Sequence, residues 1–177
     1  IVFLILIFCV LYIGFKNNIE SFENAINFRT YVINLDRSPD RLKKIKIQCD
    51  NAGIKFERWR AYDGSKLNLN ELKQKKILSP QNKMMVGAIG CSMSHINLWK
   101  HCNQLNDKYI LVLEDDCLID KKFKKKLKSY IKQLPNNWDI FYLGASNING
   151  KKISKNILIP NTNIYSRSTE NTGMYAM

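Results

Sequence analysis

The feature of the sequence that most constrains the fold is an apolar run that ends in three consecutive acids. Residues 109–113 have the length and composition expected of an inner strand that is covered on both faces. Glu114, Asp115 and Asp116 follow at once. Three adjacent carboxylates repel one another, so we expect positive charge close to them in the working protein. Open α/β sheets bind ligands at the carboxyl ends of their strands, which makes this junction the first candidate site.

Carboxylate oxygens are the ligands that Mg²⁺ and Mn²⁺ prefer. An ion of this kind could join the three acids to a diphosphate and stabilise the charge that develops on a departing nucleoside diphosphate. An acidic triplet can also simply end a strand and cap the helix that follows. On the triplet alone, this structural role is the commoner one.

The segment before the strand, residues 87–105, has the spacing of an amphipathic helix. Its predicted buried face carries Cys91, His95, Leu98, Cys102 and Leu105. Two thiols and an imidazole on one face make a zinc site conceivable, but a fourth ligand is needed, and small apolar packing is the commoner role for such thiols. A histidine on an apolar stripe is likewise more often a core residue than a ligand or a base.

An earlier segment has the pattern of a strand that leads into a capped helix. Residues 31–35 predict the strand, and Ser38 and Pro39 suit the N-cap and the first position of a helix. A helix start after a strand is a ready site for an anion, and Arg37 and Arg41 would add charge for a diphosphate. Both arginines could equally be ordinary surface residues of a first helical turn.

Together these segments resemble glycosyltransferase family 25, which includes bacterial lipooligosaccharide galactosyltransferases and collagen hydroxylysine galactosyltransferases. The resemblance rests on YVINLDRSPDR at 31–41, GAIGCSMSHINLW at 87–99 and YILVLEDD at 109–116, in the family's order. It extends from about residue 30 to the end of the chain. One departure is Ala88, at a position where the family commonly has Glu.

The resemblance implies an α/β fold of the GT-A type, with a Rossmann-like, mostly parallel sheet. The alternation of predicted strands and helices favours a parallel sheet independently. The implied reaction transfers a hexose, typically galactose, from a UDP-sugar to a saccharide, glycolipid or hydroxylysine acceptor, with inversion at the anomeric carbon. The implied cofactor is Mn²⁺ or Mg²⁺.

We assign site residues by matching positions to the family's motifs. Asp116 and Glu114 are the predicted metal ligands. The predicted contacts to the nucleotide-sugar are Asn34, Asp36, Arg37, Arg41, Glu114 and Asp115. Inversion by a single displacement also needs a general base on the acceptor hydroxyl. The sequence does not identify this base, for which Asp139 and His95 are the candidates.

Residues 1–15 contain no charged side chain and predict a transmembrane signal-anchor helix. The run is shorter than the roughly 20 residues that span a bilayer. A cleaved signal peptide and a buried first helix or strand are the alternatives. We expect residues 16–29 to form a polar stem and residues 30–177 to form the family 25 domain, incomplete at its carboxyl end. The expected location is a membrane in an unspecified compartment.

Two other classes of function compete with the enzyme. A membrane-anchored relative could keep the fold and bind a nucleotide-sugar or glycan without catalysis, and Ala88 is consistent with this alternative. The formal net charge of +13 would also suit a nucleic-acid-binding protein. However, the aromatic residues fall in the apolar stripes rather than among the lysines, and no nucleic-acid recognition motif is present. We therefore expect no nucleic-acid partner.

Overall fold

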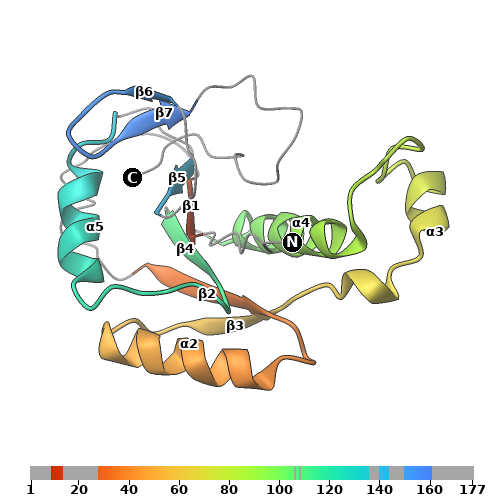
Figure 1. Ribbon diagram of the computed structural model, residues 1–177, viewed down its shortest axis with the longest axis horizontal. Coiled ribbons are helices and arrows are strands. Elements are labelled where there is room, and N and C mark those ends of the chain that lie inside the picture. The colour runs from red at the N-terminus through yellow and green to blue at the C-terminus, as the bar shows by residue number, and fades with distance from the viewer. Residues whose placement is uncertain are drawn as a thin grey trace, which may run out of the picture.

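The computed structural model describes residues 9–13, 28–105, 107, 109–135, 140–143 and 150–160. Within these residues, five strands form one sheet in the order β3-β2-β4-β1-β5, and β6 (Gly150–Lys152) pairs with β7 (Leu158–Pro160) in a separate hairpin (Figure 1). The strands of the main sheet are β1 (Cys9–Ile13), β2 (Arg29–Asn34), β3 (Glu57–Arg60), β4 (Tyr109–Glu114) and β5 (Ile140–Tyr142).

The β3-β2-β4 part of the sheet is parallel, as the alternation of strands and helices predicted. Helix α2 (Pro39–Asn51) connects β2 to β3. The longer connection from β3 to β4 contains the 3₁₀ helix η1 (Gly64–Lys66), α3 (Leu69–Gln74) and α4 (Val86–Cys102). This arrangement confirms the α/β class and fits a Rossmann-like glycosyltransferase fold. It also places the carboxyl ends of three strands side by side.

The predicted helix at the amino terminus is wrong for residues 9–13. They form β1, which pairs antiparallel with both β4 and β5, so the sheet is mixed rather than mostly parallel. A short uncharged apolar run fits an inner strand as readily as a membrane helix, and its hydrophobicity does not distinguish the two. Among the helices that the structure describes, none combines the length and apolar composition needed to cross a bilayer.

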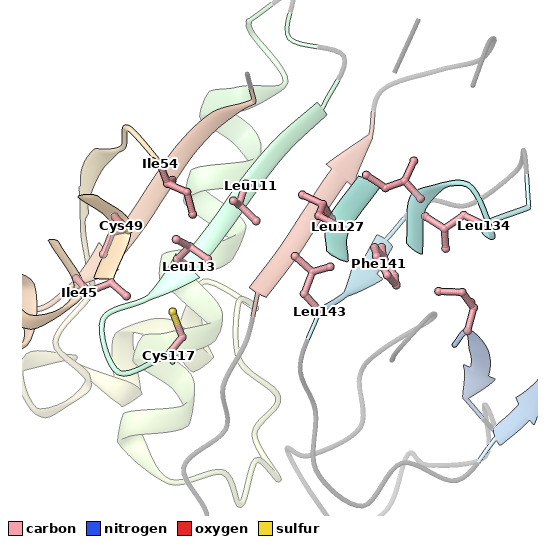
Figure 2. Close-up of a cluster of buried hydrophobic side chains, with 13 residues drawn as sticks. Ile45, Cys49, Ile54, Leu111, Leu113, Cys117, Leu127, Leu134, Phe141 and Leu143 are labelled. Atoms are coloured by element: carbon pink, nitrogen blue, oxygen red, sulfur yellow. The ribbon is translucent and has the colours of Figure 1, made fainter. Parts of the chain in front are cut away.

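Strand β4 is buried on both faces, as predicted. Its odd-numbered residues Leu111 and Leu113 pack in a cluster with α2, β5 and α5 (Phe123–Ile131). Figure 2 shows Ile45 and Cys49 on one side of this cluster and Leu127 on the other. The even-numbered residues of β4 face α4, where Ile110 and Val112 pack against Leu98, Cys102, Tyr31, Ile33 and Tyr142.

The start of α4 lies unusually close to the chain that follows β3. A Cβ atom added at Gly90 would lie 2.6 Å from the Tyr62 carbonyl oxygen and 2.7 Å from the Gly64 nitrogen. One turn further on, buried Ser94 Oγ accepts a hydrogen bond from the Tyr62 nitrogen at 2.8 Å and donates one to the Gly90 oxygen at 2.7 Å. These contacts fix the part of α4 that carries Cys91.

This close approach predicts opposite effects for two glycine substitutions in one helix. We expect Gly90→Ala to destabilise the protein by roughly 1–3 kcal/mol, because backbone atoms must move to admit the methyl group. The control Gly87→Ala should stabilise it by up to about 1 kcal/mol, because no atom lies within 4 Å of the added Cβ and alanine favours helix. Guanidinium unfolding of each variant measures both effects, and equal stabilities would contradict the tight contact.

Candidate active site

The three acids that follow β4 have different partners. Glu114 continues the even-numbered face of β4 and points toward α4. Its Oε1 accepts a hydrogen bond from Cys91 Sγ at 3.5 Å and lies 3.0 Å from His95 Nε2. Asp115 is buried on the opposite side, where its carboxylate accepts from Asn34 Nδ2 at 2.6 Å and from Arg41 Nη1 at 3.2 Å. Glu114 therefore contacts α4, whereas Asp115 contacts the end of β2 and the start of α2.

Asp116 shares Arg41 with its neighbour. Its Oδ2 accepts from Arg41 Nη1 at 3.1 Å, so this one guanidinium contacts two of the three carboxylates. The other oxygen, Oδ1, is buried without a hydrogen-bond partner among the described residues. Burial, and then the nearby Glu114 carboxylate, raise the pKa of Asp116 above its ordinary value. Arg41 thus provides part of the positive charge expected near the acids, and Asp116 retains one unsatisfied oxygen.

The network continues across β2 to β3 through two arginines. Arg58 Nε donates to Asn34 Oδ1 at 2.9 Å. Arg58 Nη2 and Arg60 Nε also donate to the carboxylate of Asp36, at 2.7 and 2.6 Å, and these two bonds lower the pKa of Asp36. Asn34, Asp36, Arg41, Asp115 and Asp116 therefore belong to one connected network of hydrogen bonds.

Sequence reasoning missed Arg58 and Arg60. Their spacing of two along a strand places both side chains on one face, and this signal could have identified them.

Arg37, by contrast, lies apart from the acidic triplet. Its Nη1 donates to the two carboxylate oxygens of Asp63 at 2.6 and 2.7 Å. Hydrogen bonds from Ser65, and then the Arg37 guanidinium, lower the pKa of Asp63.

Beside this network lies a cavity of about 640 Å³, within the size range of small-molecule sites. It is formed where β2 and β3 end and is bounded on one side by α4. Its lining combines charged and aromatic side chains, among them Asp36, Arg37, Trp59, Arg60, Tyr62 and Lys66. The cavity is therefore suited to a ligand that has both a ring and an anionic group.

The two candidate bases have different positions. His95 is only 7% exposed, and its Nε2 is directed at Glu114. Asp139 lies outside the described residues.

The predicted group of Cys91, His95 and Cys102 does not form as expected. Cys91 and His95 group with Glu114, whereas Cys102 lies in the core with Tyr31. Burial, and then Glu114, raise the pKa of the Cys91 thiol to about 12.

Comparison with known proteins identifies the family. The sequence profile described as "Glycosyltransferase family 25 (LPS biosynthesis protein)" matches residues 27–174. The chain belongs to glycosyltransferase family 25. A protein of Aedes aegypti named "Glycosyltransferase 25 family member" is 30% identical over 128 residues, which are 67% of this chain and 21% of that protein.

Two further relatives carry more specific names. "Procollagen galactosyltransferase 2" of Homo sapiens is 30% identical over 142 residues, covering 74% of this family 25 chain and 22% of the human protein. "Procollagen lysyl hydroxylase and glycosyltransferase" of Acanthamoeba polyphaga mimivirus is 32% identical over 154 residues, covering 75% and 17% respectively. The chain therefore corresponds to about a fifth of the length of these relatives.

The raised pKa of Asp116 predicts that this acid destabilises the metal-free protein. At neutral pH we expect Asp116→Asn to raise the free energy of unfolding by roughly 0.5–2 kcal/mol, because the amide removes repulsion from Glu114 and the cost of a buried charge. A folded-state pKa above the ordinary 3.8 makes the wild type lose stability as the pH rises through that window. The difference in free energy of unfolding between Asp116→Asn and the wild type should therefore disappear as the pH falls below 3.8.

Asp36→Asn provides the matched control, because it makes the same chemical change with the opposite expected sign. Its carboxylate has a lowered pKa and two arginine partners, so its loss should reduce the melting temperature at neutral pH. This deficit should shrink as the pH falls through the lowered pKa. Thermal unfolding between acid and neutral pH measures both variants. Destabilisation by Asp116→Asn at neutral pH would contradict the assignment of repulsion to Asp116.

Proposed function

We propose that this chain is the catalytic part of a galactosyltransferase that uses UDP-galactose as its donor. The proposed acceptor is a hydroxyl group of a saccharide, a glycolipid or a hydroxylysine side chain. Family membership and the name of the human relative support the reaction class. The observation that carries the proposal is the network of acids and arginines at three adjacent strand ends, next to a cavity of nucleotide size.

The acids suit the divalent cation that the family implies. Asp116 Oδ1 is a buried carboxylate oxygen without a partner among the described residues, and hard oxygen donors favour Mn²⁺ or Mg²⁺. Asp116 is the leading ligand, because Glu114 Oε1 already interacts with His95 and Cys91. When bound, the ion would supply positive charge to the diphosphate that leaves with UDP.

The other side chains bind and orient the donor. We assign the uridine to the cavity, where Tyr62 and Trp59 offer aromatic surface. Asp36 is fixed by Arg58 and Arg60 and can accept hydrogen bonds from ribose hydroxyls. Arg41, which is half exposed, lies between the acids and the solvent and can contact an anionic group of the donor.

The proposed chemistry is a single displacement with inversion. A base removes the proton of the acceptor hydroxyl as its oxygen bonds to the anomeric carbon, and the bond from that carbon to the UDP oxygen breaks. His95 is buried, and its Nε2 lies 3.0 Å from Glu114 Oε1. We therefore propose that His95 positions Glu114, and we retain Asp139 as the candidate base.

The nucleotide site predicts metal-dependent binding of UDP. Isothermal titration of UDP into the full 177-residue chain should give clearly weaker binding without Mn²⁺ than with it. Asp116→Asn should abolish the effect of Mn²⁺. The control Asp40→Asn makes the same change one residue from Arg41. This acid is exposed and, in the described part of the chain, forms an ion pair with Lys43 alone, so binding should persist.

Turnover separates the enzyme from a relative that only binds. Release of UDP from UDP-galactose, with UDP-glucose as the comparison donor, should require Mn²⁺ and be lost in Asp116→Asn. Binding of UDP without any release, with or without sugar acceptors, would support an inactive relative. Absence of UDP binding by folded protein would overturn the proposed site.

A further inference from the structure

We propose that Cys91, His95 and Glu114 form a binding site for Zn²⁺ or a similar borderline divalent metal. This site is distinct from the oxygen-ligand site proposed for the donor, because it adds sulfur and nitrogen ligands from α4. One ligand atom from each of the three residues lies within 4.8 Å of the others. The proposal rests on this grouping and does not depend on the proposed sugar transfer.

The two distances to Glu114 are close to those around a tetrahedral ion. With bonds of about 2.0 Å to nitrogen and oxygen and about 2.3 Å to sulfur, neighbouring ligand atoms of a tetrahedral zinc are about 3.3–3.5 Å apart. Glu114 Oε1 lies 3.5 Å from Cys91 Sγ and 3.0 Å from His95 Nε2. Cys91 Sγ and a ring nitrogen of His95 lie within 4.8 Å of each other. Around the ion this separation would be about 3.5 Å, so binding would draw these two side chains together by at most about 1.3 Å.

The protein holds these ligands in place without a metal. Cys91 and His95 are four residues apart on α4, so they lie one above the other on the same helical face. The helix is fixed just beside Cys91, where Gly90 packs against the backbone of Tyr62 and Gly64. Glu114 is the last residue of β4, a strand that is buried along its length. A helix and a strand, rather than loops, thus present the three groups.

The chemical character of the set selects the metal. Thiolate and imidazole ligands favour zinc and related transition metals over Mg²⁺ and Mn²⁺. On binding, Cys91 would release its thiol proton to the solvent, and both hydrogen bonds to Glu114 would be replaced by bonds to the ion. A three-residue set leaves a fourth position for water. The ion would join α4 to the end of β4.

Co²⁺ provides a spectroscopic probe of this site in the full chain. Titration in the absence of nucleotide should give a thiolate-to-cobalt charge-transfer band and the visible bands of tetrahedral cobalt, and Zn²⁺ should displace both. Co²⁺ bound by carboxylates alone gives no thiolate band, so occupation of the donor site is distinguishable. Folded protein that shows no thiolate band at saturating Co²⁺ would overturn the proposal.

Three variants locate the signal. Cys91→Ser should remove the band, whereas Cys102→Ser, which removes a core thiol from the same helix, should keep it. His95→Gln should weaken Co²⁺ binding at least about tenfold. Zn²⁺ should also raise the melting temperature of the wild type and of Cys102→Ser, but not that of Cys91→Ser. A band or a zinc-dependent stabilisation that survives in Cys91→Ser would place the metal elsewhere and contradict the proposal.

Discussion

The site depends on the way β4 passes from a buried strand to a charged exit. Side chains alternate along a strand, so Glu114 and Asp115 point to opposite sides and find separate partners. A buried carboxylate is costly unless it is hydrogen-bonded and paired with a positive charge. Asp115 meets this condition through Asn34 and Arg41. The strand thus brings three acids to one point without placing all three in a single uncompensated cluster.

The charges of the network nearly balance before any ligand is present. Arg58 and Arg60 pair with Asp36, and Arg41 is shared between Asp115 and Asp116. The arginines are therefore engaged by protein acids. A diphosphate would add negative charge to a site with little free positive charge, which is the physical reason for expecting a divalent cation to accompany it.

Local patterns in the sequence predicted the elements that carry the motifs. The apolar run of β4, the strand predicted at residues 31–35 and the Pro39 helix start all depend on neighbouring residues, and all three elements form. The pairing of Asp36 with Arg58 and Arg60 depends instead on the register of β2 against β3, which sequence does not specify. The grouping of Glu114 with Cys91 likewise requires the packing of α4 on β4. A strand at residues 9–13 was only an alternative to the predicted anchor helix, because hydrophobicity alone does not distinguish a strand from a helix.

Two helices hold the acids from opposite sides, and each has its own anchor to the rest of the fold. Ser38 occupies the N-cap of α2 but makes no side-chain cap; its carbonyl oxygen instead accepts a hydrogen bond from Asn34 Nδ2 at 3.0 Å. This bond ties the start of α2 to the end of β2, and Arg41 follows within the first turn. Helix α4 is fixed by the contact of Gly90 with the chain after β3. The anchor of α2 shares Asn34 Nδ2 with Asp115, so the helix start and this acid are positioned together. The contact at Gly90 involves none of the three acids, and it holds α4 in place beside Glu114 through the backbone alone.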